Sequence, residues 1–177
     1  MATPALYSQI IPPAIRHLQN LSGILTKAVQ FADEKQMPHE KILEFRLIED
    51  MRPLPYQVQS CCNTIKFIVP RLKVGENVVF PDDETTFDQL QTRISKTVEL
   101  LQAIDPHKFA GKDAEPVLME TARMGNFKFE SGQEYVSMYA LPNFHFHFSS
   151  AYCILRHLGV PIGAFDYLGK ETFVKAP

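Results

Sequence analysis

The sequence predicts an all-α fold, a four-helix bundle with a short β-hairpin before the last long helix. Four stretches repeat apolar residues every three or four positions, which is the pattern of a helix with one buried face. Prolines, glycines and polar runs separate these stretches. With 177 residues and 45% hydrophobic content, the chain can bury one sizeable core. We therefore expect a single domain over residues 1–177.

The first predicted helix runs from Ile10 to Phe31 and ends before Pro38. Its apolar stripe comprises Ile10, Ala14, Leu21, Ile24, Ala28 and Phe31. Pro12 and Pro13 either open this helix or kink it, because a proline removes a backbone hydrogen bond and clashes with the preceding turn. His17 falls on the apolar stripe, where a core histidine bonded to a neighbour is the ordinary explanation.

The second long helix follows Pro53 and Pro55, after a short helix expected over residues 39–46. Its buried stripe comprises Leu54, Val58, Cys61, Ile65, Ile68 and Leu72, and Gln57 stands beside this stripe, facing partly inward. The third helix begins at Thr86. Gln89 follows three residues later, which is the spacing of a capping box.

The region after Pro106 breaks the helical pattern. We expect strands over 117–121 and 127–129, joined by a turn at 124–126 and lying across the helices. Helical spacing returns at Gln133 and ends at a glycine cap. The last stripe comprises Val136, Ala140, Asn143, His147, Ala151, Ile154 and Leu158. Pro142 should kink or interrupt this helix. The tail after residue 160 lacks helical periodicity and should wrap the bundle through Phe165, Tyr167 and Leu168.

Two polar residues interrupt the last stripe. Asn143 and His147 are one turn apart and therefore share a core-facing row, whereas His145 is rotated by about 200° from Asn143. Polar groups in so apolar a setting need hydrogen-bond partners or a ligand. The pair consequently marks the candidate site.

Composition excludes several classes of function. A net charge of -2 gives no electrostatic footprint for nucleic acid. The apolar runs are far shorter than the ~20 residues that cross a bilayer, and no secretory signal begins the sequence. An odd count of 3 cysteines argues against a disulfide framework. We expect a soluble cytoplasmic protein that binds neither nucleic acid nor membrane. Phosphate-binding, dinucleotide-binding and zinc-protease motifs are absent from the sequence.

Three segments in order, residues 46–59, 86–94 and 144–169, resemble a domain-of-unknown-function family of small helical bundles grouped with the DinB/YfiT-like metalloenzymes. The resemblance covers nearly the whole chain and implies the bundle fold. The function of that family is not established.

Metal-binding members of the wider superfamily carry a histidine on helix 2 and a His-x-x-x-His pair on the last helix. By that comparison the three positions in this chain are Gln57, Asn143 and His147. Amide oxygens are weak ligands for transition-metal ions. We therefore expect no metal and no cofactor. A divalent metal held by His147, His17 and a carboxylate such as Asp50 is the second hypothesis.

The leading hypothesis is a small-molecule-binding bundle that performs acid–base chemistry of the isomerase or lyase type without a tightly bound metal. The catalytic candidates are His147, Asn143, Gln57 and Asp50. An apolar or aromatic ligand would contact His17, Tyr56, Tyr139, Phe144 and Tyr152. The alternatives are a divalent-metal-dependent DinB-like transferase or isomerase, and a non-catalytic homodimer packed helix to helix.

Overall fold

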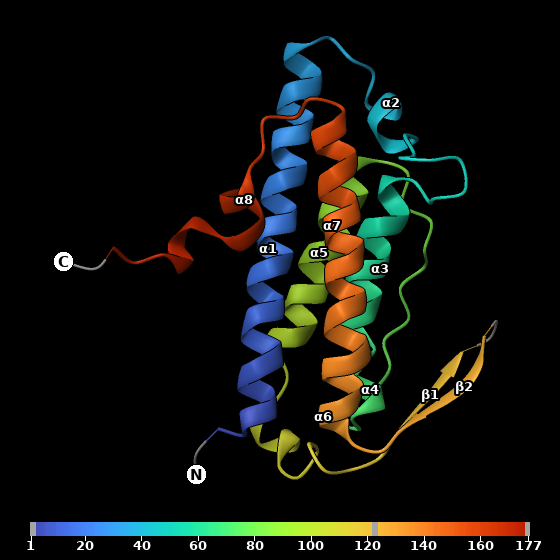
Figure 1. The fold of residues 1–177 in the computed structure, drawn as a ribbon, viewed down its shortest axis with the longest axis vertical. Coiled ribbons are helices and arrows are strands. Elements are labelled where there is room, and N and C mark those ends of the chain that lie inside the picture. The colour runs from blue at the N-terminus through green and yellow to red at the C-terminus, as the bar shows by residue number, and fades with distance from the viewer. Residues whose placement is uncertain (1–2, 122–123, 176–177) are drawn as a thin grey trace.

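The computed structural model describes residues 3–121 and 124–175 and confirms the predicted fold class. Its four long helices are α1 (Ala5–Glu34), α3 (Leu54–Lys66), α5 (Phe87–Gln102) and α7 (Leu141–His157). Figure 1 shows α1 and α7 running in one direction and α3 and α5 in the other. Along the part of the chain that the structure describes, no helix is long and apolar enough to cross a bilayer.

Short elements connect the long helices. They are α2 (His39–Leu43), α4 (Ile68–Arg71), η1 (Pro106–Phe109), β1 (Val117–Thr121), β2 (Gly125–Phe129), α6 (Gly132–Glu134), η2 (Tyr135–Ala140), α8 (Ala164–Leu168) and η3 (Lys170–Thr172). The second predicted helix is thus divided at Phe67 into α3 and α4. After α4, residues 73–86 return along α3 to the start of α5, and we call this segment the crossover loop.

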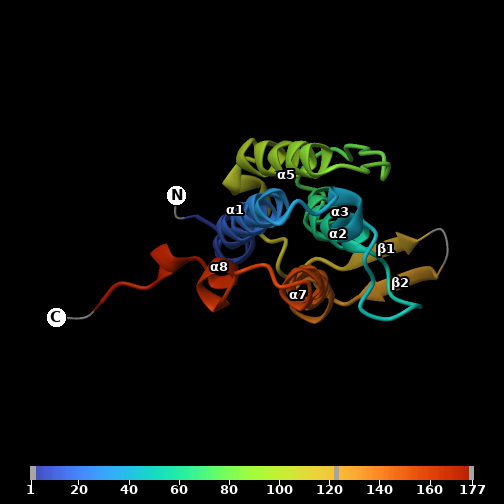
Figure 2. The same ribbon diagram turned by 90° about the horizontal axis from the view of Figure 1, so that it is seen from above.

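The core lies where α1 and α3 meet, between α5 on one side and α7 on the other (Figure 2). The predicted stripes supply it: Ile10, Leu21 and Ile24 from α1, Leu54, Val58 and Ile65 from α3, and Leu90 and Ile94 from α5 are all buried. At ~25 cal/mol per Å² of apolar surface removed from water, each such side chain contributes about 1.5–3 kcal/mol. Burial of these faces is what sets the four helices side by side.

The helix starts follow the local sequence. α1 begins at Ala5, earlier than predicted, so Pro12 and Pro13 lie inside the helix. The predicted capping box of α5 is confirmed, because Thr86 Oγ1 accepts from the backbone N–H of Gln89 and the Gln89 side chain accepts from the N–H of Thr86. At its C-terminus α7 ends before Gly159, whose φ of 94° suits glycine.

The hairpin forms where it was predicted, but its turn and position differ. β1 and β2 pair antiparallel with Val117 opposite Phe129, and Gly125 already belongs to β2 rather than to the turn. Met124 lies in a turn as expected, whereas Gly125 and Asn126 belong to β2; residues 122–123 lie outside the described part of the chain. Instead of lying across the helices, the hairpin projects beside α4 (Figure 1). Only Val117 and Met119 bury their side chains among its described residues.

Pro142 does not break the last helix. The chain passes from α6 through η2, a π-helical segment, directly into α7. A proline lacks the N–H for the helical bond and clashes with the previous turn, and the wider π turn before it relieves both problems. Within this segment the rings of Tyr135 and Tyr139 stack on each other, with centroids 5.9 Å apart.

The tail departs from its prediction by forming the short helix α8, which packs on α1. Tyr167 anchors it by stacking on Phe148 of α7, with ring centroids 4.1 Å apart. Phe165 and Leu168, which we expected to cover the bundle, are exposed instead. Of the three side chains expected to cover the bundle, Tyr167 alone packs on it, and the ion pair between Lys27 and Asp166 at 2.6 Å adds a second link from α1 to α8.

Candidate functional site

A pocket of about 390 Å³ lies between α3 and α7. From α3 it is lined by Tyr56, Gln59, Ser60, Asn63 and Thr64, and from η2 and α7 by Tyr139, Asn143 and His147. Asn143 and His147 thus share one wall, as their spacing predicted. A purely structural histidine would be expected in a closed core. The pocket beside the His147 imidazole is open instead.

Gln57 and His147 form the central contact of this site. His147 Nδ1 lies 2.8 Å from Gln57 Oε1, and Gln57 Nε2 donates to the backbone carbonyl of Arg52 at 2.8 Å. A carbonyl only accepts, so the amide nitrogen must face Arg52 and the amide oxygen must face the imidazole. His147 therefore carries its proton on Nδ1, and Nε2 of the neutral ring keeps a free lone pair.

Burial sets the charge of this imidazole. Gln57 is only 2% exposed, at the first turn of α3. Removal from water lowers the pKa of His147 below its ordinary value, because burial disfavours the charged ring. Tyr56 packs edge-on against the imidazole, with ring centroids 5.8 Å apart. At neutral pH, His147 is consequently a neutral, oriented base.

Asn143 occupies the same wall one turn before His147. Its Nδ2 lies 2.7 Å from Thr64 Oγ1, so the amide bridges α7 to α3. Thr64 is buried, whereas Asn143 is half-buried and borders the pocket. The remaining polar groups of the amide are available to a ligand in the pocket.

The donor set does not fit a transition-metal centre. Gln57 Oε1 is already engaged by the Nδ1–H of His147, and Asn143 is bonded to Thr64. One imidazole then remains, whereas such centres use three or four nitrogen, sulfur or carboxylate ligands. Within residues 3–121 and 124–175, no three His, Cys, Asp or Glu side chains are grouped to hold a metal ion.

Four of the predicted site residues lie away from this pocket. Phe144 is buried in the core, since it sits about 100° around the helix from Asn143. Tyr152 packs against Tyr167 of α8. Asp50 is exposed in the loop after α2. His17 contacts His145 edge-to-face, with ring centroids 5.0 Å apart, on the α1 side of α7. His17 and Asp50 therefore do not join His147 in one cavity.

His17 and His145 form a histidine pair between α1, α7 and α8. His145 Nδ1 lies 3.0 Å from the hydroxyl of Tyr167, which also lies 3.2 Å from Ser149 Oγ. Burial, followed by the neighbouring His145 and Arg16, lowers the pKa of His17 from 6.5 to about 4. Burial also lowers the pKa of His145. Both rings are therefore neutral partners in packing at neutral pH.

The depressed pKa of His17 predicts acid sensitivity. Unfolded His17 binds a proton near pH 6.5, whereas folded His17 binds one only near pH 4. Its contribution to stability is thus full above pH 6.5 and is lost as the pH falls toward 4. For this half-buried ring we expect the free energy of unfolding to fall by up to about 1 kcal/mol per pH unit.

Urea unfolding at several pH values between 5 and 6.5 measures how steeply the free energy of unfolding depends on pH. In this range the protonation of carboxylates changes little. His17→Gln should flatten the slope in part, because His145 and His147 still contribute. His107→Gln, at an exposed position, should leave it unchanged. Equal slopes for His17→Gln and the wild-type protein would contradict the assignment.

Several pocket residues were not identified from the sequence. These include Ser60, Asn63, Phe67 and Arg71, which continue at helical spacing from the predicted Tyr56, beside the buried stripe of α3 and α4. That spacing could have identified these residues, because it predicts a second row on the helix next to the core-facing row. Which residues of α7 face this row follows only from the packing of α3 against α7.

Comparison with known proteins places the chain in a family. The model of a domain of unknown function, DUF1993, matches residues 6–168. The chain belongs to the DUF1993 family. This confirms the resemblance found in the sequence. The DUF1993 chain matches no curated protein.

A solved structure extends the comparison. The crystal structure of a DinB family member protein from Shewanella denitrificans is 34% identical to this chain, with a TM-score of 0.85, over 97% of this chain and 96% of that chain. The DinB-like fold of this DUF1993 protein is thereby shown. The homodimer and the single-domain boundary remain predictions from the sequence.

Proposed function

We propose that this DUF1993 protein binds a small, partly apolar or aromatic molecule between α3 and α7 and catalyses an acid–base reaction with His147. The observation that carries the proposal is the hydrogen-bond chain from the Arg52 carbonyl through Gln57 to His147 Nδ1. This chain supplies a neutral imidazole with a free Nε2 in an open pocket. A histidine so placed is suited to general base catalysis near neutral pH.

The proposed reaction moves one proton. Nε2 takes a proton from a C–H bond of the ligand, whose electron pair shifts into the ligand. The resulting imidazolium returns the proton to a different atom of the same molecule, so an isomerisation needs no further reactant. Gln57 Oε1 accepts from Nδ1–H throughout and keeps the ring oriented. The Asn143 amide, held by Thr64, is placed to bind a polar group of the ligand.

Deuterium exchange tests this proposal before the natural substrate is identified. Small aromatic and apolar carbon acids are incubated with the protein in D2O, and NMR detects C–H positions that acquire deuterium. Loss of a general base costs about 10²–10⁴-fold in rate. His147→Gln should reduce exchange by that factor, and His107→Gln should not.

The pH dependence provides an independent check. Because the base must be neutral, the exchange rate should fall as the pH drops through the pKa of His147. Burial lowers that pKa, so the decline should begin below pH 6.5. Exchange that survives His147→Gln would exclude His147 as the base.

A further inference from the structure

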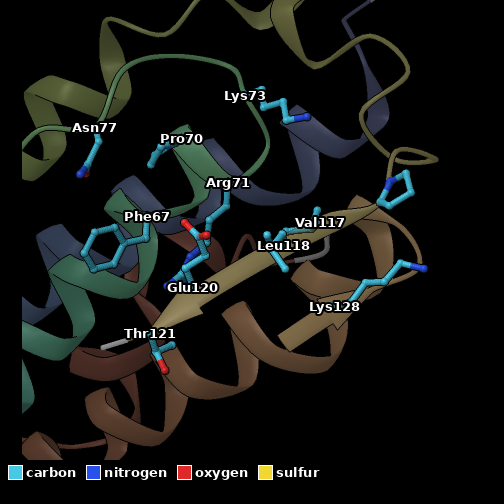
Figure 3. A pocket seen from close by; sticks show the side chains of 11 residues that line it. Phe67, Pro70, Arg71, Lys73, Asn77, Val117, Leu118, Glu120, Thr121 and Lys128 are labelled. Atoms are coloured by element: carbon cyan, nitrogen blue, oxygen red, sulfur yellow. The ribbon is translucent and has the colours of Figure 1, made fainter. Parts of the chain in front are cut away.

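The pocket of His147 adjoins a larger groove. This groove, of about 770 Å³, lies between α4, the start of the crossover loop and the β1–β2 hairpin (Figure 3). Phe67 and Arg71 line both spaces. A ligand in the pocket of His147 can therefore extend along α3 to Arg71.

Aromatic rings hold the Arg71 guanidinium in place. Its central carbon lies 5.0 Å from the ring centroid of Phe67, 5.8 Å from that of Tyr135 and 6.0 Å from that of Tyr139. Arg71 Nη1 also donates to the Tyr135 hydroxyl at 3.1 Å. Stacked rings fix the plane of a guanidinium while leaving most of its N–H groups free. Arg71 is thus preorganised rather than a mobile surface cation.

The surrounding charges leave Arg71 without an anionic partner. Within residues 3–121 and 124–175 it forms no ion pair with a carboxylate. Asp82, which also lines the pocket of His147, is bound to Arg93 at 2.6 Å. Lys73, Lys128 and Glu120 line the outer groove, and Lys128 pairs with Glu130. A planar anion would supply what the guanidinium lacks.

The spacing along the pocket wall sets the length of such a ligand. Tyr139, Asn143 and His147 follow one another every four residues, and all three line the pocket. Tyr139, which is packed against Arg71, is separated from His147 by eight residues, or roughly 12 Å at 1.5 Å per residue. This separation along the helix axis indicates the approximate length that a ligand needs to reach from Arg71 to His147.

We propose that the natural ligand is an elongated organic carboxylate, whose carboxylate pairs with Arg71 and whose apolar or aromatic part reaches His147. This rests on the proposed function and specifies its substrate class. Arginine binds a carboxylate through two parallel N–H···O bonds, a pairing that amides and alcohols cannot reproduce. The aromatic rings of Tyr139 and Tyr56 border the path between the two groups.

Binding of ω-phenylalkanoates, from phenylacetate to 6-phenylhexanoate, tests this proposal against the corresponding amides. Isothermal titration calorimetry should show the carboxylates binding at least tenfold more tightly than the amides. Affinity should rise with chain length as the ring approaches His147. Arg71→Met, which keeps the apolar stem, should abolish the preference for the carboxylate. Lys73→Met, at a neighbouring exposed cation of the groove, should retain it.

Measurements on His147→Gln and on the wild-type protein distinguish the Arg71 site from the proposed catalytic role of His147. His147→Gln should still bind carboxylates more tightly than amides, because Arg71 is intact. If the wild-type protein shows this preference but catalyses no C–H exchange, the catalytic role of His147 is excluded and the Arg71 site stands. Three results would overturn the Arg71 site. They are equal affinity for carboxylates and amides, a carboxylate preference that persists in Arg71→Met, and failure of every carboxylate to bind at millimolar concentration. Folding of Arg71→Met is checked by its circular dichroism and unfolding curve.

Discussion

Replacement of Arg93 by methionine is expected to lower the free energy of unfolding by about 3–5 kcal/mol, the usual cost of removing one partner from a buried ion pair. The Arg93 side chain is only 1% exposed on α5. Its guanidinium donates to Glu84 at 2.7 Å, Asp82 at 2.6 Å, Asn63 at 2.8 Å and the Pro81 carbonyl at 2.8 Å. Its loss would leave the carboxylate of Glu84, whose side chain is only 11% exposed, without this counterion.

Urea unfolding followed by circular dichroism measures this change. Lys96→Met, at an exposed position on the same helix, should change stability by less than about 0.5 kcal/mol. Adding Glu84→Gln and Asp82→Asn to Arg93→Met should recover part of the loss, because the uncompensated charges then disappear. A change below 1 kcal/mol for Arg93→Met would show that the network does not hold the loop.

The Arg93 network also bears on the pocket. Glu84 accepts from Gln59 and Asp82 accepts from Asn63, and both of these α3 residues line the wall beside His147. Arg93 therefore fixes the crossover loop along α3, and this sets one border of the pocket. Ligand binding should weaken together with stability in Arg93→Met.

The second large effect is expected at Gln57. In Gln57→Glu, a carboxylate would accept the Nδ1–H of His147, and an opposite charge in direct contact raises an imidazole pKa by about 1–3 units. The variant should thus hold His147 protonated at pH values where the wild-type ring is neutral. Two-dimensional NMR of the histidine rings during a pH titration measures this directly.

Gln57→Met serves as the matched control. It keeps the side-chain volume but removes the acceptor, so the protonated ring loses a partner and the pKa of His147 should fall below that of the wild-type protein. The two variants are therefore expected to shift the pKa in opposite directions. If Gln57→Glu left the pKa of His147 unchanged, the hydrogen bond between these side chains would not exist in solution.

Much of the fold was predictable from local sequence. The spacing of apolar residues identified the four long helices, and Thr86 with Gln89 identified the start of α5. The same spacing assigned Asn143 and His147 to one row and sent His145 to another face, as the structure shows. The family resemblance added Gln57, whose amide the structure places against His147.

Other features depended on which helix faces meet. The apolar stripe of α1 included His17 but contained no information about its neighbour, which is His145 rather than His147. Likewise, the position of the hairpin beside α4 depends on a few buried side chains of β1 that periodicity cannot orient.

By itself, the sequence determined the helices, their buried faces and the polar row that contains His147, because these follow from the geometry of one helix. Only the tertiary structure decided that Gln57 fixes the tautomer of His147 and that Arg71 lies at the far end of the same pocket. Both facts require contacts between segments distant in sequence, and the periodicity of a single helix defines a direction for each side chain but not its partner.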